Sequence, residues 1–568
     1  MGLTTSLYTS LSALSANSEA ISVAGNNIAN VNTTGFKSSQ LRFETQISQT
    51  FSEGNRPSPD LGGTNPLQVG LGVRLGATQR NFANGALQPT GINTDLAVEG
   101  NGFFVVRFAD GDKYTRAGTF QLDSDFDLVN PDGGKVQGFG VDPDFNVVEG
   151  TVTDINIPLG SLTIAEATTQ VRLAGNLNSD GDSATMGSIN TSDPLTDSSS
   201  ALPATAASLL DDLEDATATD LFSVGDIITI SGAQKGGATL PDHTFEVGAV
   251  NTTGSDANGT TLAELGAFLE DVLGIDTTVG GGVSVSVTGE LLIESNSGFD
   301  NGIELEPSDI IVNAGVAPTT PFDFTQTQDA DGESVRTTFV AFDSLGAPMT
   351  IDMTITLEAK TAAGTTWRYY AQSEDDSDLD RVLGNGVLSF DTNGQLASVT
   401  DGSFTIDRLG TGAASPQTIT SIFDDEQGPV SALADTASQL SAISQDGSAI
   451  GTLVDFSIGA DGAINGIFSN SELRSLGRIV LASFANPNGL VEEGGNLYNV
   501  TPNSGLAALV SPGSGGSGRI VGGALELSNV ELSQEFINLI SASTGFSASS
   551  RVLTTSDQLI QELLNSVR

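Results

Sequence analysis

Apolar residues recur at seven-residue spacing at both ends of this chain. Near the N-terminus the series is Leu7, Leu14, Ile21 and Ile28. Near the C-terminus it is longer and has two apolar residues beside it: Leu532, Leu539, Phe546, Leu553, Ile560 and Val567, with Phe536 and Leu564. Such spacing lines up side chains along one seam of a helix, the arrangement by which two helices pack lengthwise. We therefore predict two terminal helices that pack against each other or against neighbouring copies.

Polar residues and glycine interrupt both seams. The N-terminal helix should run from about residue 4 to residue 28 or 31, where an Asn-rich and Gly-containing segment ends it; the interrupting residues are Asn26, Asn27 and Gly35. Ser543, Ser550 and Asp557 leave the C-terminal seam only half apolar. Neither helix is therefore predicted to be a self-sufficient coiled coil. We expect both ends to be disordered in the monomer and to fold when many copies pack together.

The middle of the chain has the pattern of short strands. Residues 37–94 are rich in Pro and Gly and predict an extended linker that becomes ordered on assembly. From residue 95 onward, short apolar runs separated by Asp- and Gly-containing turns predict hairpins, one over 103–115 and another over 338–357. Residues 453–500 have the same pattern, and 511–518 predict a flexible hinge before the last helix.

Residues 181–319 differ in composition, with Ser, Thr, Asp, Ala and Gly predominating. Thr261 and Glu264 form a possible capping box before an apolar helical pattern that ends at Gly274. Val283, Val285 and Val287 then alternate as a strand would. These features predict a small α+β insert rather than disorder.

The predicted fold class is mixed and mainly β, a nested multi-domain subunit with paired, coiled-coil-like terminal helices and outward β-rich domains. Residues 1–94 and 522–568 would form the inner domain with the terminal helices and the linker. The further domains would be 95–165 with 440–521 (inner β-domain), 166–180 with 320–439 (outer β-domain), and 181–319 (the outermost insert).

Composition narrows the class of function. The 568 residues include no cysteine, which excludes disulfides and cysteine-ligated metals, and a single histidine, His243, which is too few for a multi-histidine site. His243 is best interpreted as a turn or strand-edge residue. The net charge of −49 argues against nucleic acid and anionic membranes as partners.

The charge is also unevenly distributed. Residues 1–95 hold five basic and five acidic side chains and 522–568 hold two and five, so 96–521 carry the remaining −46. Nearly neutral ends can pack densely against copies of themselves, whereas an acidic middle stays hydrated. The first basic residue is Lys37 and no apolar run reaches about 18 residues. We therefore expect neither membrane insertion nor a cleaved leader.

No motif indicates catalysis. Gly513, Gly515 and Gly518 match a dinucleotide-binding spacing, but no helix is predicted to follow them. Asp123, Asp125 and Asp127 have a calcium-loop spacing that lacks the later Gly and Glu, and the acidic run 374–380 is best interpreted as solvated charge. We expect no enzyme activity, no cofactor and no metal; calcium on the acidic middle remains an alternative.

Two long terminal segments carry a resemblance to a known family. Residues 25–37 (GNNIANVNTTGFK) resemble the N-terminal motif of the bacterial flagellar rod and hook proteins, and residues 523–540 and 551–555 resemble the closing helix of that family. Shorter matches at 69–73, 101–104, 114–118 and 476–487 favour the hook proteins within that family, since rod proteins lack a large acidic β-rich middle. Two positions depart from the pattern: many members have Gln-Arg-x-Tyr where residues 543–546 stand, and glycine at Asp127.

The resemblance implies a subunit exported unfolded through the flagellar type III apparatus, without a cleaved signal peptide, to the extracellular hook at the cell surface. There it would polymerise with identical copies, beneath a cap, into a flexible curved tube that transmits torque from rod to filament. Its partners would be the rod, hook-cap and hook–filament junction proteins. The residues expected to mediate assembly are Leu7, Leu14, Ile21, Asn26, Asn27, Ile28, Asn30, Gly35, Phe36, Leu532, Phe536, Leu539, Phe546, Leu553, Ile560, Leu564 and Val567.

Two alternatives stay open at this point. One is another axial flagellar protein, either a distal rod protein or a hook–filament junction protein. The other is a secreted acidic adhesin stabilised by calcium.

Overall fold

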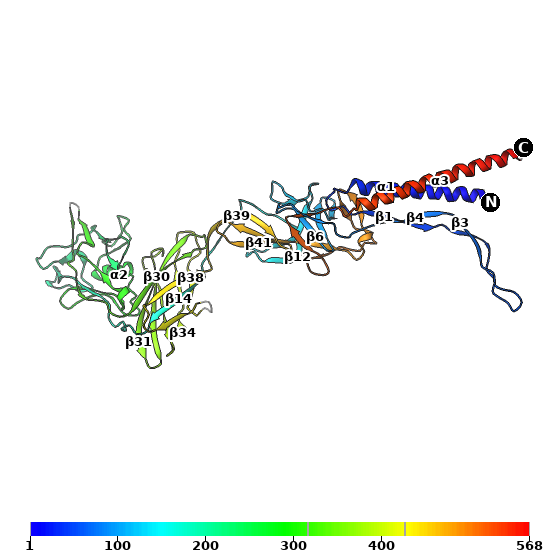
Figure 1. Cartoon of the computed structure of the whole chain (residues 1–568). Coiled ribbons are helices and arrows are strands. Elements are labelled where there is room, and N and C mark those ends of the chain that lie inside the picture. Colours follow the sequence, from blue (N-terminus) through cyan, green and yellow to red (C-terminus); the bar gives the residue numbers. More distant parts are fainter. Residues whose placement is uncertain (1, 315–316, 425–427, 567–568) are drawn as a thin grey trace. The chain divides into compact units, whose positions relative to one another are not determined.

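The structure is a computed structural model that describes residues 2–314, 317–424 and 428–566 (Figure 1). It divides into two compact units, Met1–Leu162 with Thr452–Arg568 (unit 1) and Thr163–Gly451 (unit 2). The chain therefore leaves unit 1 once and returns to complete it. Strands predominate and the two long helices are terminal, which confirms the predicted fold class.

The two terminal helices pack against each other. They are α1 (Gly2–Ala29) and α3 (Leu532–Ser566), drawn in blue and red in Figure 1. Ser6 contacts Ser556 and Asn17 lies against Gly545, so the helices are antiparallel. The predicted pairing of the two ends is confirmed.

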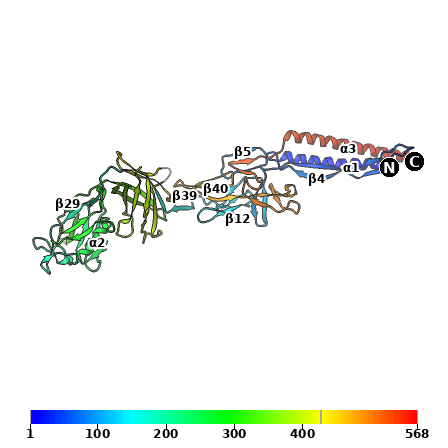
Figure 2. The same cartoon turned by 90° about the horizontal axis from the view of Figure 1, so that it is seen from below.

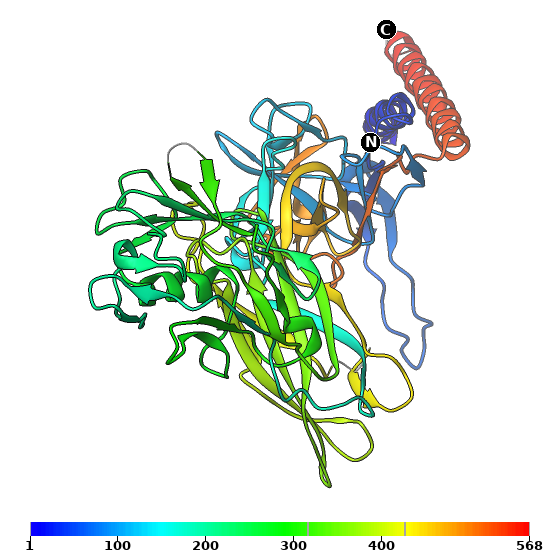
Figure 3. The ribbon, with the colours of Figure 1, turned by 90° about the vertical axis from the view of Figure 1, so that its left-hand side faces the viewer.

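Residues 39–80 are more regular than the predicted linker. They form an antiparallel ribbon of β1 (Ser39–Thr45) with β4 (Val73–Arg80), which continues into β2 (Ser48–Ser52) with β3 (Leu67–Gly70). Helix α1 lies between α3 and β4 in Figure 2, and it contacts both β1 and β4. The far part of the ribbon is the long blue loop of Figure 3, and its side chains are exposed. These strands were not predicted from the sequence because Pro and Gly residues interrupt the turn between them.

One sheet makes up the body of unit 1. Its main path runs β39-β40-β41-β11-β7-β8-β44-β43, and the predicted hairpin over 103–115 is the β7–β8 pair. Ring contacts among Phe103, Tyr114, Phe484 and Tyr498, with centroids 4.9–5.7 Å apart, fill one of its cores. In the order of that path, the strands are Ser448–Ile458, Ala463–Phe468, Leu473–Ile479, Lys135–Val141, Phe103–Phe108, Gly111–Thr115, Leu497–Asn499 and Val491–Gly494. The strands beside the path are β9 (Gln121–Leu122), β10 (Leu128–Val129), β12 (Val147–Asp154), β42 (Leu481–Ser483) and β45 (Ala508–Val510).

The segment before α3 is extended. Strand β46 (Arg519–Gly522) pairs with β6 (Leu96–Glu99), and β47 (Ala524–Glu526) pairs with β5 (Leu87–Pro89). The closing helix therefore begins at Leu532, and the interpretation of 523–526 as part of that helix was wrong. These backbone pairs tie the chain just before α3 to the segment that follows the ribbon.

Unit 2 contains two hydrophobic cores. The first lies between two sheets, β30-β31-β32-β33-β34 and β35-β36-β14-β37 with β38 beside β14. The predicted hairpin over 338–357 is β30 with β31. In the order just given, the strands of one sheet are Ser334–Phe342, Pro348–Thr361, Gly364–Ser373, Val382–Phe390 and Leu396–Thr400. Those of the other are Ser403–Ile406, Gln417–Ile422, Gln170–Asn178, Val430–Leu433 and, for β38, Gln439–Gln445. Strand β13 (Thr163–Glu166) belongs to neither sheet.

The second core, from Leu195 to Phe324, surrounds α2 (Leu262–Val272). Thr261 and Glu264 form the predicted capping box, and Val283 and Val285 lie in β24, but Val287 lies beyond the strand and is exposed. The sheets are β24-β25-β15-β29 (Gly282–Val285, Leu291–Glu294, Ile189–Thr191, Thr325–Gln328), β23-β22-β19-β27-β28 (Ala257–Gly259, His243–Val247, Ile227–Ile230, Ile310–Ala314, Ala317–Thr319), β17-β16-β18 (Leu202–Pro203, Thr196–Asp197, Leu213–Glu214) and β21-β20-β26 (Ala238–Thr239, Gln234–Lys235, Ile303–Glu304).

Candidate assembly site

The apolar series of α1 lies at the edge of the helix contact. Leu7, Leu14, Ile21 and Ile28 are all half-buried. The fully buried positions of this helix carry small or polar side chains: Ser10, Ala16, Ala24 and Asn27. Tyr8 and Leu11 expose 70% and 55% of their surface. The helix therefore presents large apolar side chains that its partner within the chain does not cover.

The apolar series of α3 is covered even less. Leu539, Phe546, Leu553 and Ile560 are half-buried, whereas Leu532, Phe536 and Leu564 expose 40%, 51% and 66% of their surface. Val567 lies outside the described residues. The structure therefore brings together only part of the predicted seam.

Small and polar residues occupy the closest approach of the two helices. On α3 the buried positions are Glu535, Ala542 and Ser556. Ser6 Oγ lies 3.3 Å from Ser556 Oγ, and a Cβ built on Gly545 would lie 2.7 Å from Oδ1 of Asn17. These contacts were missed because a search for large apolar residues passes over them; the available signal was that Glu535, Ala542 and Ser556 fall on one seven-residue series.

The motif after α1 is held by specific hydrogen bonds. Asn27 is fully buried and exchanges two hydrogen bonds with the backbone of Ser39, at 2.9 and 3.0 Å, which fixes the start of β1. Asn26 is exposed, and Asn30 donates back to the Asn26 carbonyl at 3.0 Å. These asparagines turn the chain from helix into ribbon.

Gly35 and Phe36 lie where the N-terminal motif meets the C-terminal segment. The Gly35 N–H donates to the Glu526 carbonyl at 2.7 Å, with φ at +70°. A Cβ there would lie 2.6 Å from the Ala117 nitrogen, so only glycine fits this close approach. Phe36 is buried beside it.

A buried charge network lies immediately after this turn. Lys37 Nζ lies 2.6 Å from Glu526 Oε1, and both side chains are completely buried. Glu526 also accepts the Gly85 N–H at 2.8 Å, and Arg116 approaches its other oxygen at 3.6 Å. Burial lowers the pKa of both Lys37 and Arg116, and the Glu526 charge opposes that shift. The network ties residues from three distant parts of the sequence to the base of the helix pair.

The other candidate residues have structural partners. Asp127 forms an ion pair with Lys135 and accepts a hydrogen bond from the Asn156 amide at 2.8 Å, while His243 is the first residue of β22 and so lies at the end of a strand. After Gly518 the chain enters β46 and not a helix.

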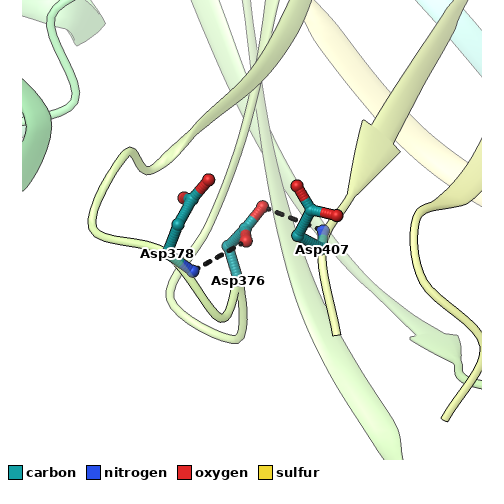
Figure 4. A group of neighbouring side chains, drawn as sticks. All are labelled: Asp376, Asp378 and Asp407. Carbon is teal, nitrogen blue, oxygen red and sulfur yellow. Dashed lines mark hydrogen bonds between the residues drawn. The ribbon is translucent and has the colours of Figure 1, made fainter. Parts of the chain in front are cut away.

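In the acidic run, Asp376 accepts backbone N–H groups from Asp378 at 3.2 Å and Asp407 at 3.3 Å (Figure 4). Glu374, Asp378 and Asp380 are exposed, as expected of solvated charge, whereas burial raises the pKa of Asp376. Figure 4 thus shows a carboxylate whose oxygens already hold two loops together.

Four family models match the chain. They are described as "Flagella basal body rod protein" (residues 7–37), "Flagellar hook protein FlgE/F/G D1 domain" (97–176), "Flagellar basal body protein FlaE D2 domain" (311–448) and "Flagellar basal body rod FlgEFG protein C-terminal" (521–566). The first and the last contain almost all of the helix pair, together with Lys37 and Glu526 of the buried charge network.

Relatives match over the full length. The flagellar hook protein FlgE of Treponema pallidum is 30% identical over 99% of both chains, and that of Borreliella burgdorferi is 30% identical over 98% of both. The chain belongs to the flagellar hook protein family. The Caulobacter vibrioides member is 27% identical over 100% of both chains. Within this family the chain is a structural hook subunit. This finding favours the hook protein over the two alternatives, another axial flagellar protein and a secreted acidic adhesin.

None of these four models covers residues 177–310, most of the second core of unit 2. Among the helices of the described residues, none combines the length and apolar character needed to cross a membrane.

Proposed function

We propose that the chain polymerises through α1 and α3 into the flexible curved tube of the hook, which transmits torque from rod to filament. The observation that carries this proposal is the pattern of burial on the helix pair. Small residues bring the helices together, while Tyr8, Leu11, Phe536, Ile540 and Leu564 remain more than half exposed. Large apolar side chains exposed along adjoining helices are typical of an interaction surface, which copies of the same chain would cover.

The charge distribution supports the same role. The helical ends are nearly neutral, so dense packing of many copies carries little electrostatic repulsion. The assembly residues proposed from the sequence would then act in two ways. The apolar residues of the helices would contact neighbouring copies. The motif residues Asn26, Asn27, Asn30, Gly35 and Phe36 would fix the direction in which the helices leave the rest of the unit.

The outer parts of the chain would provide flexibility. We propose the nested domains 1–94 with 522–568, 95–165 with 440–521, 166–180 with 320–439, and 181–319, in order from the inside of the tube outward. When a curved tube turns, each row of subunits must shorten and lengthen. The outer domains would slide against neighbours while the inner helices hold the tube together.

Export and partners follow from the same role. The subunit would travel unfolded through the flagellar type III apparatus, without a cleaved signal peptide, and assemble beneath a cap at the cell surface. It would contact rod proteins at one end of the hook and junction proteins at the other. The role is structural, and we propose no enzyme activity, nucleic-acid binding or membrane insertion.

The test is seeded polymerisation of the purified chain together with deletion of its gene. We expect tubes from the wild-type chain and cells that lack hooks and external filaments. Phe536→Ser with Ile540→Ser should reduce polymerisation, whereas Leu506→Ser, on a residue that is 91% exposed outside the helices, should not. Intact hooks in the deletion strain would overturn the proposal.

A further inference from the structure

A groove beside the helix pair is lined by basic and amide side chains. Strands β1 and β4 contribute Arg42, Gln79 and Arg80, and neighbouring loops contribute Asn81, Asn101 and Asn488. Its volume is about 540 Å³. No carboxylate stands among the described residues that line it. In a chain with 70 acidic and 21 basic residues, such a lining is unusual.

The two arginines of the groove are held differently. Arg80 is fixed by an ion pair with Glu492, and its guanidinium lies 5.2 Å from the centre of the Tyr498 ring. Arg42 is exposed and donates from Nε to Gln79 at 3.3 Å. A guanidinium carries five N–H donors, so Arg42 keeps its terminal nitrogens for an acceptor that enters the groove.

The groove adjoins the surface that we assign to assembly. Gln40 of β1 lines both this groove and a pocket of about 550 Å³ between α1, β1 and α3. A copy that packs on the helix pair would therefore lie next to the groove. Within a polymer of identical chains, most residues of a neighbouring copy belong to the segment 96–521, which carries −46.

We propose that the groove receives an acidic loop from the strand-rich middle of a second copy, with Arg42 as the charge that holds it. This inference rests on the proposed polymerisation. Carboxylates pair with guanidinium groups through two parallel hydrogen bonds, and amides supply further donors to the loop backbone. The contact would fix the register between copies, which the apolar helices alone leave free to slide.

Charge reversal tests the proposal. We expect Arg42→Glu to slow seeded polymerisation at low salt by about tenfold, because it places a carboxylate opposite a carboxylate. The matched control is Arg74→Glu: Arg74 lies on β4, is exposed, and pairs with Glu44 at 2.8 Å outside the groove. Arg74→Glu should change the rate less than twofold. Equal rates for wild type and Arg42→Glu would overturn the inference.

A second measurement, crosslinking, tests the same contact without a charge-reversed variant, so it does not require that such a variant folds. A photoreactive residue in place of Asn101, in otherwise wild-type polymer, should crosslink to a carboxylate-rich segment of a second copy. Crosslinks only within one chain, or only to the neutral terminal helices, would overturn the inference. Failure of the wild-type chain to polymerise would instead contradict the proposed function, so the two failures are distinguishable.

Discussion

Lys37 Nζ lies 2.6 Å from Glu526 Oε1, and 489 positions of sequence separate the two residues. Neither side chain exposes any surface. Removing one partner of such a pair leaves a charge in a medium that cannot solvate it. The network therefore makes correct pairing of the two ends of the chain a condition for stability.

We expect Glu526→Gln to destabilise unit 1 by about 3–5 kcal/mol, because Lys37 and Arg116 both lose their shared counter-charge. Lys37→Met should cost less, since Glu526 keeps Arg116 and the Gly85 N–H. Urea unfolding followed by a probe in unit 1 measures both. Glu44→Gln, which breaks an exposed pair with Arg74, is the control and should change stability by less than about 1 kcal/mol. A larger loss for Lys37→Met than for Glu526→Gln would contradict this account.

Two helical glycines should respond in opposite ways. A Cβ at Gly25 of α1 meets nothing within 4 Å, so Gly25→Ala should stabilise that helix by about 0.5–1 kcal/mol. Gly545→Leu should separate α3 from α1, because even its Cβ would lie 2.7 Å from Asn17. Circular dichroism and pelleting of polymer measure the two effects. Polymer from Gly545→Leu at the wild-type yield would show that the close approach is dispensable.

An exposed turn in unit 2 carries an alanine in a strained conformation. Ala218 has φ of +54°, and Asp215 accepts the N–H groups of Thr217 and Thr219 around it. In the similar turn at Asp343, the corresponding residue is Gly346, with φ of +79°. Ala218→Gly should therefore increase the free energy of unfolding of unit 2 by at most about 1 kcal/mol, measured as a higher melting temperature.

The neighbouring exposed Ala216 is the control for that substitution. Its φ is not positive, so Ala216→Gly should leave stability unchanged or lower it. A gain from Ala216→Gly as large as that from Ala218→Gly would mean that relief of strain is not the cause.

Lys235 should make the stability of unit 2 rise with pH above about pH 7. Burial, with Arg381 and Arg336 nearby, lowers the pKa of Lys235 to about 7. The unfolded chain then binds more protons than the folded one between about pH 7 and 10.5, so this group makes stability rise with pH across that window and leaves it level below. Lys235→Met should remove this slope. The Gly274 carbonyl that Lys235 contacts keeps the Gln372 amide at 2.7 Å.

Thermal unfolding of both proteins at pH 7 and pH 9.5 measures the effect as a difference. The melting temperature of Lys235→Met should exceed that of the wild-type protein by more at pH 7 than at pH 9.5. Lys360→Met, on an exposed lysine, controls for the loss of a surface charge. A constant difference at both pH values would contradict the assignment.

The terminal helices, the central hairpins and the capping box at Thr261 could be predicted, because each depends on residues close together in the sequence. The details of the helix contact could not. Periodicity locates apolar residues on a face, but Gly545 and Ser556 bring the helices together through their small size, which a hydrophobic pattern does not record. The leucines beside them are then left for other partners.

The buried charge network could not be predicted from the sequence, for a different reason. Lys37 and Glu526 both stand within the terminal motifs, yet nothing in either neighbourhood indicates that one is the partner of the other. Their pairing depends on how β47 lies beside β5, a relation between segments more than four hundred residues apart. The ribbon over 39–80 was likewise missed, since its strands pair across a turn broken by Pro and Gly.

The insertion of unit 2 within unit 1 imposes an order of events on a newly made chain. Residues 163–451 can complete their two cores by themselves, but unit 1 must wait for its final 117 residues (452–568). A chain that stops before residue 526 leaves Lys37 without its counter-charge and lacks α3 altogether. The fold thereby acts as a check on completeness, because only a copy that includes residues 532–566 can form the helix pair that the next copy is proposed to bind.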